Sequence, residues 1–200
     1  MTRILDNRMN NMDNRMVDTT AKEVMLIVEE SISFVLKYYN LTWNPPYTIE
    51  ELVRDCKNLY FTPGLGKAIV HHCLVRNALE RGQLSGFQLR RWIQMSLPRA
   101  KAYMKLHFKS YLITPTRDEF YENLYILSFA GYLCVYAIKN KKYSFPFHVA
   151  VEIARAMYTF KRSSNYYWGT CARSRIYNHM HKQIHDESED DGFETGNEGD

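Results

Sequence analysis

The chain has 200 residues, which is enough for one domain with a substantial hydrophobic core, and its 26 Lys and Arg exceed its 22 Asp and Glu by a small margin. Its four cysteines form no C-x-x-C pair, which indicates buried thiols in a reducing compartment and excludes a disulfide-based scaffold. The N-terminus lacks the apolar core of a signal peptide and the C-terminus lacks a hydrophobic anchor, so we expect a soluble protein in the cytoplasm or nucleus.

The charges are unevenly distributed along the chain. Residues 186–200 hold eight of the 22 acidic residues and no basic one, which leaves 14 acidic residues against 26 basic ones and a charge of about +12 on the rest of the chain. The composition of this tail is typical of a disordered end, and its charge would also suit folding back over a basic face. We therefore expect a flexible arm over 1–20, a helical bundle over 21–185 and an acidic disordered tail over 186–200.

Apolar residues recur with helical spacing from Thr20, a suitable N-cap, to the tyrosines at 38 and 39. The apolar face of this first helix comprises Val24, Ile27, Val28, Ile32, Val35 and Leu36. Pro45 and Pro46 then interrupt the helical pattern, because a proline disfavours helix at the residue before it.

A second helix is predicted over 49–61, with Thr48 as N-cap and Glu51 completing a capping box. The P-G-L-G-K sequence at 63–67 is interpreted as the linker that ends it. This sequence lacks the G-x-x-x-x-G-K-[ST] spacing of a phosphate-binding loop and follows a helix rather than a strand. Further helices are predicted over 67–81, 87–96, 99–113, 147–162 and 165–185, with no run of strand alternation, so the fold class is all-α.

The segment 120–139 is apolar on nearly every face and holds no charged residue between Glu122 and Lys139. Such a helix is either a membrane span or the buried centre of a bundle. Asn123, Ser128 and several tyrosines interrupt its apolar character, which favours a single-domain bundle built around this helix over a span. Its predicted core residues are Leu124, Ile126, Leu127, Phe129, Leu133 and Val135.

No arrangement of side chains in the sequence indicates catalysis. His181 and His185 are spaced i,i+4 near His179, a geometry that zinc accepts on a helix, but no carboxylate lies between them as in H-E-x-x-H. We interpret these histidines as surface residues. The sequence thus predicts a protein that is not an enzyme and has no metal site or cofactor.

Four motifs, in chain order, resemble those of the Bcl-2 family of apoptosis regulators. Residues 23–43 look like the family's first helix and end at Trp43, and L-S-F-A-G-Y-L-C-V at 127–135 looks like the body of its hydrophobic central helix. Leu74 and Ala78 resemble the L-x-x-x-[GA] of its third homology motif, and Y-Y-W-G at 166–169 falls near its second. The family's groove arginine corresponds to Glu122. Cellular members usually carry a membrane tail, and an acidic tail in its place looks more like a soluble divergent or viral member.

The resemblance implies a protein-interaction module that binds an amphipathic helix of a partner protein in a groove. The expected groove residues are Phe87, Leu89, Trp92, Tyr103, Leu106, Phe108, Glu122, Tyr125 and Phe129. Because Glu122 stands where the family has arginine, we expect an unusual partner, or one that carries a basic residue at that point.

An alternative function follows from the basic body and its interleaved rings. Single-stranded nucleic acid is bound by stacking on aromatic rings together with cationic contacts to phosphates, and the acidic tail would then be autoinhibitory. The residues for this alternative are Lys101, Lys105, Lys141, Lys142, Lys161, Arg162, Tyr166, Tyr167 and Trp168. Helical spacing alone also produces such interleaving, with rings packed inward and lysine stems at the rim.

Overall fold

The computed structural model describes residues 19–45, 49–80, 87–113, 118–161, 166–174 and 177. Within these ranges all regular structure is helical, which confirms the predicted all-α bundle. The seven principal helices are α2 (Ala21–Tyr38), α3 (Ile49–Arg54), α4 (Pro63–Glu80), α5 (Leu89–Gln94), α6 (Leu97–Ile113), α7 (Glu119–Lys139) and α8 (Phe145–Phe160). A shorter helical segment covers 166–174. The expected arm and acidic tail lie outside the described residues, apart from Thr19 and Thr20 at the end of the arm.

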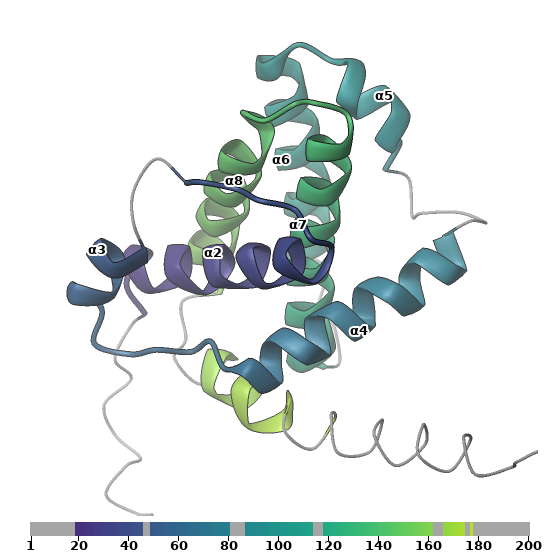
Figure 1. The fold of residues 1–200 in the computed structure, drawn as a ribbon. Helices are drawn as coiled ribbons and strands as arrows, with labels where there is room; N and C mark the ends of the chain where they lie inside the picture. Colours follow the sequence, from purple (N-terminus) through teal and green to yellow (C-terminus); the bar gives the residue numbers. More distant parts are fainter. Residues whose placement is uncertain are drawn as a thin grey trace, which may run out of the picture.

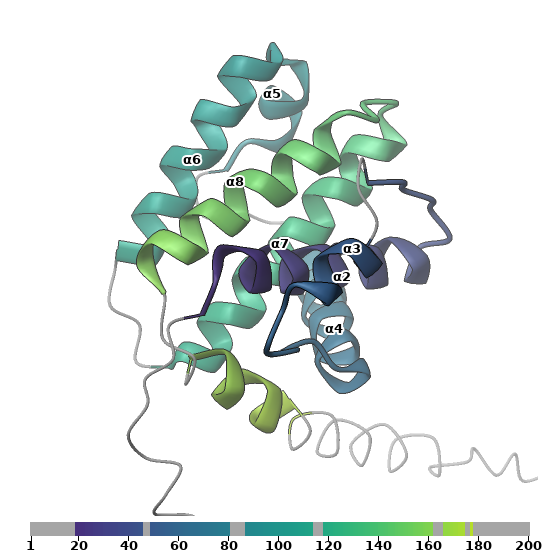
Figure 2. The same ribbon diagram turned by 90° about the vertical axis from the view of Figure 1, so that its left-hand side faces the viewer.

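Helix α7 is the centre of the bundle, as its continuous apolar sequence predicts. Helices α2, α4 and α8 all pack against it, and α2 crosses over α7 and α8, which run side by side, and α6 lies along α8 (Figures 1 and 2). Nearly every α7 side chain is buried, and this includes all six predicted core residues, Leu124, Ile126, Leu127, Phe129, Leu133 and Val135. No helix in the described ranges is both long and apolar enough to cross a membrane.

Helix α2 begins with the local signals that its sequence contains. The Thr20 side chain accepts a hydrogen bond from the backbone N–H of Glu23, and the Glu23 carboxylate accepts one from the backbone N–H of Thr20, forming a capping box. The predicted apolar face, Val24, Ile27, Val28, Ile32, Val35 and Leu36, is buried along its whole length. The first predicted helix is therefore confirmed in both its start and its packing face.

Helices α2 and α7 approach each other closely at Gly131. An ideal Cβ atom built on Gly131 would lie 2.7 Å from a methyl carbon of Val35 on α2, which is closer than real Cβ contacts allow. The missing side chain thus lets the two backbones cross at short range. An ideal Cβ atom built on Gly66 in α4 would likewise lie 2.8 Å from the ring of Phe34 on α2, so Gly66 allows a close approach there too.

Helix α4 is joined to α7 by two buried hydrogen bonds. The Ser128 hydroxyl donates to the carbonyl of Ile69 at 3.1 Å, and the thiol of Cys73 donates to the carbonyl of Ser128 at 3.0 Å. A third buried bond, from the Asn123 amide to the Thr170 hydroxyl at 3.1 Å, joins α7 to the segment 166–174. The polar residues of the apolar helix are therefore used for contacts between helices.

Two sequence predictions around residues 55–67 were wrong. Helix α3 ends at Arg54 rather than near residue 61, because the buried carboxylate of Glu23 accepts hydrogen bonds from the backbone N–H groups of Lys57 and Asn58 and holds that segment out of helical geometry. The P-G-L-G-K sequence is not a linker but the first turns of α4, in which the Thr62 hydroxyl accepts from the N–H of Leu65. Thr48 lies outside the described residues.

Candidate partner-binding site

Most of the expected groove residues form an aromatic cluster inside the bundle, between α5, α6 and α7. Phe87, Trp92, Phe108, Tyr125 and Phe129 are all buried. In this conformation they pack against one another and are not presented to a partner.

Phe87, which directly precedes α5, is the centre of this cluster. Its ring centroid lies 4.8 Å from that of Tyr103, 5.1 Å from those of His107 and Phe129, and 5.9 Å from that of Trp92. These separations fall in the range of favourable edge and tilted aromatic contacts. Phe87 therefore fills the space between α5, α6 and α7.

Polar contacts hold this aromatic cluster in place. The hydroxyl of Tyr103 accepts a hydrogen bond from the backbone N–H of Gln88 at 3.0 Å, and the ring nitrogen Nε2 of His107 lies 3.3 Å from the hydroxyl of Tyr125. The expected groove set omitted His107, although its position one turn after Tyr103 on α6 places both rings on one helix face.

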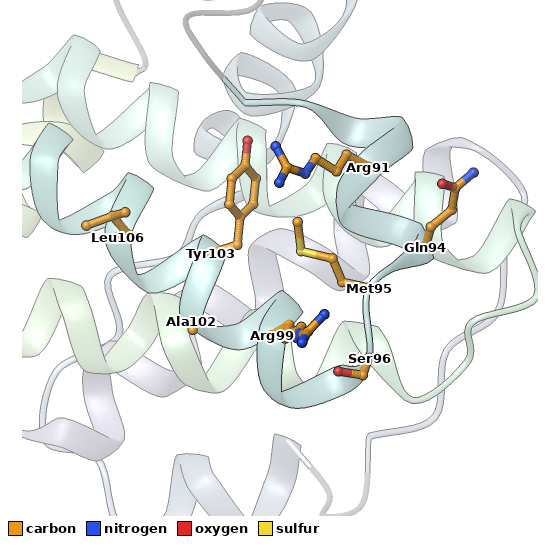
Figure 3. Close-up of a pocket in the computed structure, with 8 residues that line it drawn as sticks. All are labelled: Arg91, Gln94, Met95, Ser96, Arg99, Ala102, Tyr103 and Leu106. Carbon is orange, nitrogen blue, oxygen red and sulfur yellow. The ribbon is translucent and has the colours of Figure 1, made fainter.

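Leu106 and Tyr103 line an open pocket between α5 and α6 with a volume of about 600 Å³ (Figure 3). The side chain of Leu106 is 69% exposed, which is unusual for a leucine on a packed helix. The complete lining is Arg91, Gln94, Met95, Ser96, Arg99, Ala102, Tyr103 and Leu106. Leu89, also expected in the groove, is half-buried and packs against the core instead.

The lining of this α5–α6 pocket is apolar with a basic edge. The thioether of Met95 lies between the guanidinium groups of Arg91 and Arg99, and the ring of Tyr103 stands beside that of Arg91 (Figure 3). No acidic residue is among the lining residues. Such a surface combines an apolar floor with positive charge, so it suits an apolar side chain flanked by a carboxylate.

The sequence did not predict six of the eight lining residues, because the pocket is formed where the chain turns between α5 and α6. Helix α5 ends at Gln94 and α6 begins at Leu97, so Met95 and Ser96 turn the backbone between the two helices. The S-L-P sequence at 96–98 was the available signal, since serine before a helix and proline in its first turn are typical of a helix start.

Glu122 does not reach this pocket. Its side chain is buried, and its Oε2 atom lies 3.2 Å from Nζ of Lys161, the residue that follows α8. The expectation that Glu122 faces a partner is therefore corrected, because its charge is already balanced within the bundle.

The structure divides the residues of the nucleic-acid alternative among separate places. Tyr166 and Tyr167 are buried, Lys161 pairs with Glu122, and Trp168 is exposed. Lys141 and Lys142 are exposed before α8, whose 16 residues span about 24 Å and separate them from Trp168, which follows its other end. Lys101 and Lys105 lie on α6, and Arg162 lies outside the described residues. The two buried tyrosines are thus not available for stacking with bases in this conformation.

Within the described residues, no group of three or more His, Cys, Asp and Glu side chains is arranged to hold a metal ion. The histidines at 179, 181 and 185 lie outside these ranges. Comparison with models of protein families finds no match, and no curated protein is similar in sequence.

Proposed function

We propose that this protein is a non-enzymatic interaction module that binds an amphipathic helix of a partner at the α5–α6 pocket, as the Bcl-2-like resemblance of its sequence implies. The observation that carries the proposal is the open apolar pocket of about 600 Å³ at which Leu106 is 69% exposed. An exposed leucine beside a concave apolar surface is typical of a protein contact site. Helices α2, α4 and α8 pack around the apolar helix α7, so the pocket lies on the outside of a bundle with a buried central helix.

The pocket's chemistry defines the ligand that would suit it. Helical ligands present apolar anchors at i, i+3 or i+4 and i+7, and here Met95, Tyr103 and Leu106 supply the apolar contact. Arg91 and Arg99 favour a ligand with an acidic residue next to its anchors. This preference replaces the expected basic partner residue opposite Glu122.

The buried aromatic cluster limits how deeply such a ligand binds. Phe87 occupies the space next to Tyr103, so a ligand that leaves it in place contacts only the α5–α6 pocket. Deeper insertion requires Phe87 to move out of its contacts with Trp92 and Phe129. We therefore expect shallow docking of one or two anchors by a ligand that does not displace Phe87.

Calorimetric titration against a panel of amphipathic helical peptides tests the proposal. The panel includes helices of apoptosis regulators and, for each, a version whose acidic residues are replaced by lysine. We expect binding of the acidic versions, with Leu106→Ala weakening it by about 1–2 kcal/mol and Arg99→Glu weakening it further, as truncation of central contact residues does.

Leu59→Ala is the matched control, because Leu59 is also an exposed leucine but lies before α4, outside the pocket. It should leave the affinity unchanged. Binding that is insensitive to Leu106 and Arg99, or no binding to any peptide of the panel, would contradict the proposal.

A further inference from the structure

A second pocket lies between α6 and α8, on a different face of α6 from the first. Its volume is about 240 Å³, and Lys105, Lys109, Glu152, Arg155, Ala156, Thr159 and Phe160 line it. The ring of Phe160, at the end of α8, is 38% exposed here. The two pockets share no lining residue, so this site is independent of the proposed helix-binding site.

The α6–α8 pocket has an excess of positive charge. Lys105 and Lys109 are spaced i,i+4 on α6, and Lys101 lies one turn before them. Among the described residues, none of these lysines forms an ion pair within 4.0 Å. The one carboxylate in the lining, Glu152, accepts from Arg155 through both its oxygens at 3.1 Å.

Like charges at i,i+4 repel each other, so this row of lysines favours an anionic neighbour. At the start of α8, burial lowers the pKa of the His148 imidazole, the nearby charge of Lys101 lowers it further, and the charge of Glu152 opposes this shift.

The chain itself contains a segment that matches this pocket. Residues 186–200 have eight acidic residues and no basic one, and their single aromatic residue, Phe193, lies between Asp191 and Glu194 with one glycine intervening. The pocket has the complementary composition, since the apolar side chains of Ala156 and Phe160 lie among basic groups. An aromatic ring flanked by carboxylates therefore complements both the apolar wall and the positive charge of the α6–α8 pocket.

The length of chain permits this contact. Tyr177 is the last described residue, and the 16 residues from there to Phe193 can span up to about 50 Å when extended. Helix α7, with 21 residues, is only about 30 Å long. The extended tether is thus longer than the central helix, and it keeps the tail at an effective concentration on the order of millimolar.

We propose that the acidic tail, residues 186–200, binds in the α6–α8 pocket, with Phe193 against Phe160 and the flanking carboxylates beside Lys105 and Lys109. The tail then acts as an intramolecular ligand that screens this basic face from other anions. The contact is electrostatic in large part, so it weakens with salt as the Debye length falls from about 10 Å at 0.1 M to about 3 Å at 1 M.

Zero-length carbodiimide cross-linking of the full chain, followed by peptide mass spectrometry, tests this proposal. The reagent joins a lysine amine to a carboxylate only where the two are in contact. We expect Lys105 and Lys109 to carry most cross-links to residues 186–200. The yield should be independent of protein concentration and should fall several-fold at 1 M salt.

Two variants of the full chain sharpen the test. Lys105→Glu with Lys109→Glu should reduce total cross-linking of the tail, and Phe193→Ser should reduce it while leaving every tail carboxylate in place. The matched control is Lys141→Glu with Lys142→Glu, since these exposed lysines lie outside the pocket and should not contribute.

Tail cross-links spread evenly over the exposed lysines, or a yield unaffected by Phe193→Ser, would overturn the proposal. So would a yield that rises with protein concentration, because the tail would then bind a second copy. An absence of tail cross-links to α6 counts against it equally. None of these outcomes bears on peptide binding at the α5–α6 pocket.

Discussion

Lys161 and Glu122 form an ion pair that joins the end of α8 to the first turn of α7, with 3.2 Å between Nζ and Oε2. The glutamate side chain is fully buried, whereas that of the lysine keeps partial contact with solvent. The Lys161 ammonium also lies 5.5 Å from the ring centroid of Tyr166. The backbone carbonyl of Lys161 accepts a hydrogen bond from the Tyr167 hydroxyl at 3.0 Å. One residue thus links α7, α8 and the segment 166–174.

Replacing Lys161 by methionine should destabilise the fold, because it removes the positive charge that lies 3.2 Å from the buried carboxylate of Glu122. Loss of one partner of a buried pair costs roughly 3–5 kcal/mol, and we expect the lower end of that range because Lys161 is partly exposed. Urea unfolding measures the change. The double variant Glu122→Gln with Lys161→Met should recover most of the stability, and Lys141→Met should match the wild type. A fully stable Lys161→Met protein would contradict the structural role of this pair.

Gly131→Ala should destabilise the crossing of α2 and α7, because the new methyl group would overlap the side chain of Val35. Overpacking of this kind typically costs about 1–3 kcal/mol. Adding Val35→Ala should cost less in the Gly131→Ala background than in the wild type, and a double-mutant cycle measures that coupling.

Gly169→Ala is the control for that substitution. Gly169 is helical and nothing lies within 4 Å of its ideal Cβ position, so alanine should stabilise the protein by about 0.5–1 kcal/mol. Equal effects at positions 131 and 169 would show that the α2–α7 crossing is not tight.

Leu133→Ala and Leu106→Ala should differ in their effect on the free energy of unfolding, because the first residue lies in the core and the second on the surface. Leu133 is fully buried on α7, so its truncation should lower the free energy of unfolding by roughly 2–5 kcal/mol. Leu106 is largely exposed, so its truncation should change stability by less than about 0.5 kcal/mol. Thermal and urea unfolding measure both values. A large loss at Leu106 would place it in the core rather than at a binding surface.

Glu30 should make stability fall as the pH rises from about 4.5 to about 7. Burial raises the pKa of its carboxyl from 4.5 to about 7, so the folded protein binds more protons than the unfolded chain between these values. Since unfolding releases those protons, the free energy of unfolding decreases with pH over this window. Glu30→Gln should flatten the dependence and should stabilise the protein at pH 7.5. Unfolding curves at pH 5 and pH 7.5 test this, and identical pH slopes for the two proteins would refute it.

The parts of the fold that the sequence predicted are those set by local signals. The N-cap at Thr20 and the apolar run without charged residues after Glu122 each lie within one helix, and both helices form as expected. The end of α3 could not be predicted, because it depends on Glu23, more than 30 residues earlier, accepting hydrogen bonds from Lys57 and Asn58. Such a contact leaves no periodic pattern in the sequence.

The candidate site was predicted only in part for a related reason. Helical spacing gathers aromatic residues on one face but does not say whether that face points inward, and Phe87 and Phe108 proved to be core residues. Arg91 and Arg99 line the same pocket because the chain turns at Met95 and Ser96, between α5 and α6. Surface geometry of this kind follows from tertiary packing.

The paired hydrogen bonds between α4 and α7 determine which helix segments open together. Ser128 donates to Ile69, and Cys73, one turn further along α4, donates back to Ser128, so separating these helices breaks both bonds inside an apolar interior. Backbone amides of α4 around Cys73 should therefore exchange with deuterated solvent as slowly as those around Ser128, in one cooperative unit. A rearrangement that leaves this unit closed must involve other elements, and α5 takes part in neither of these hydrogen bonds.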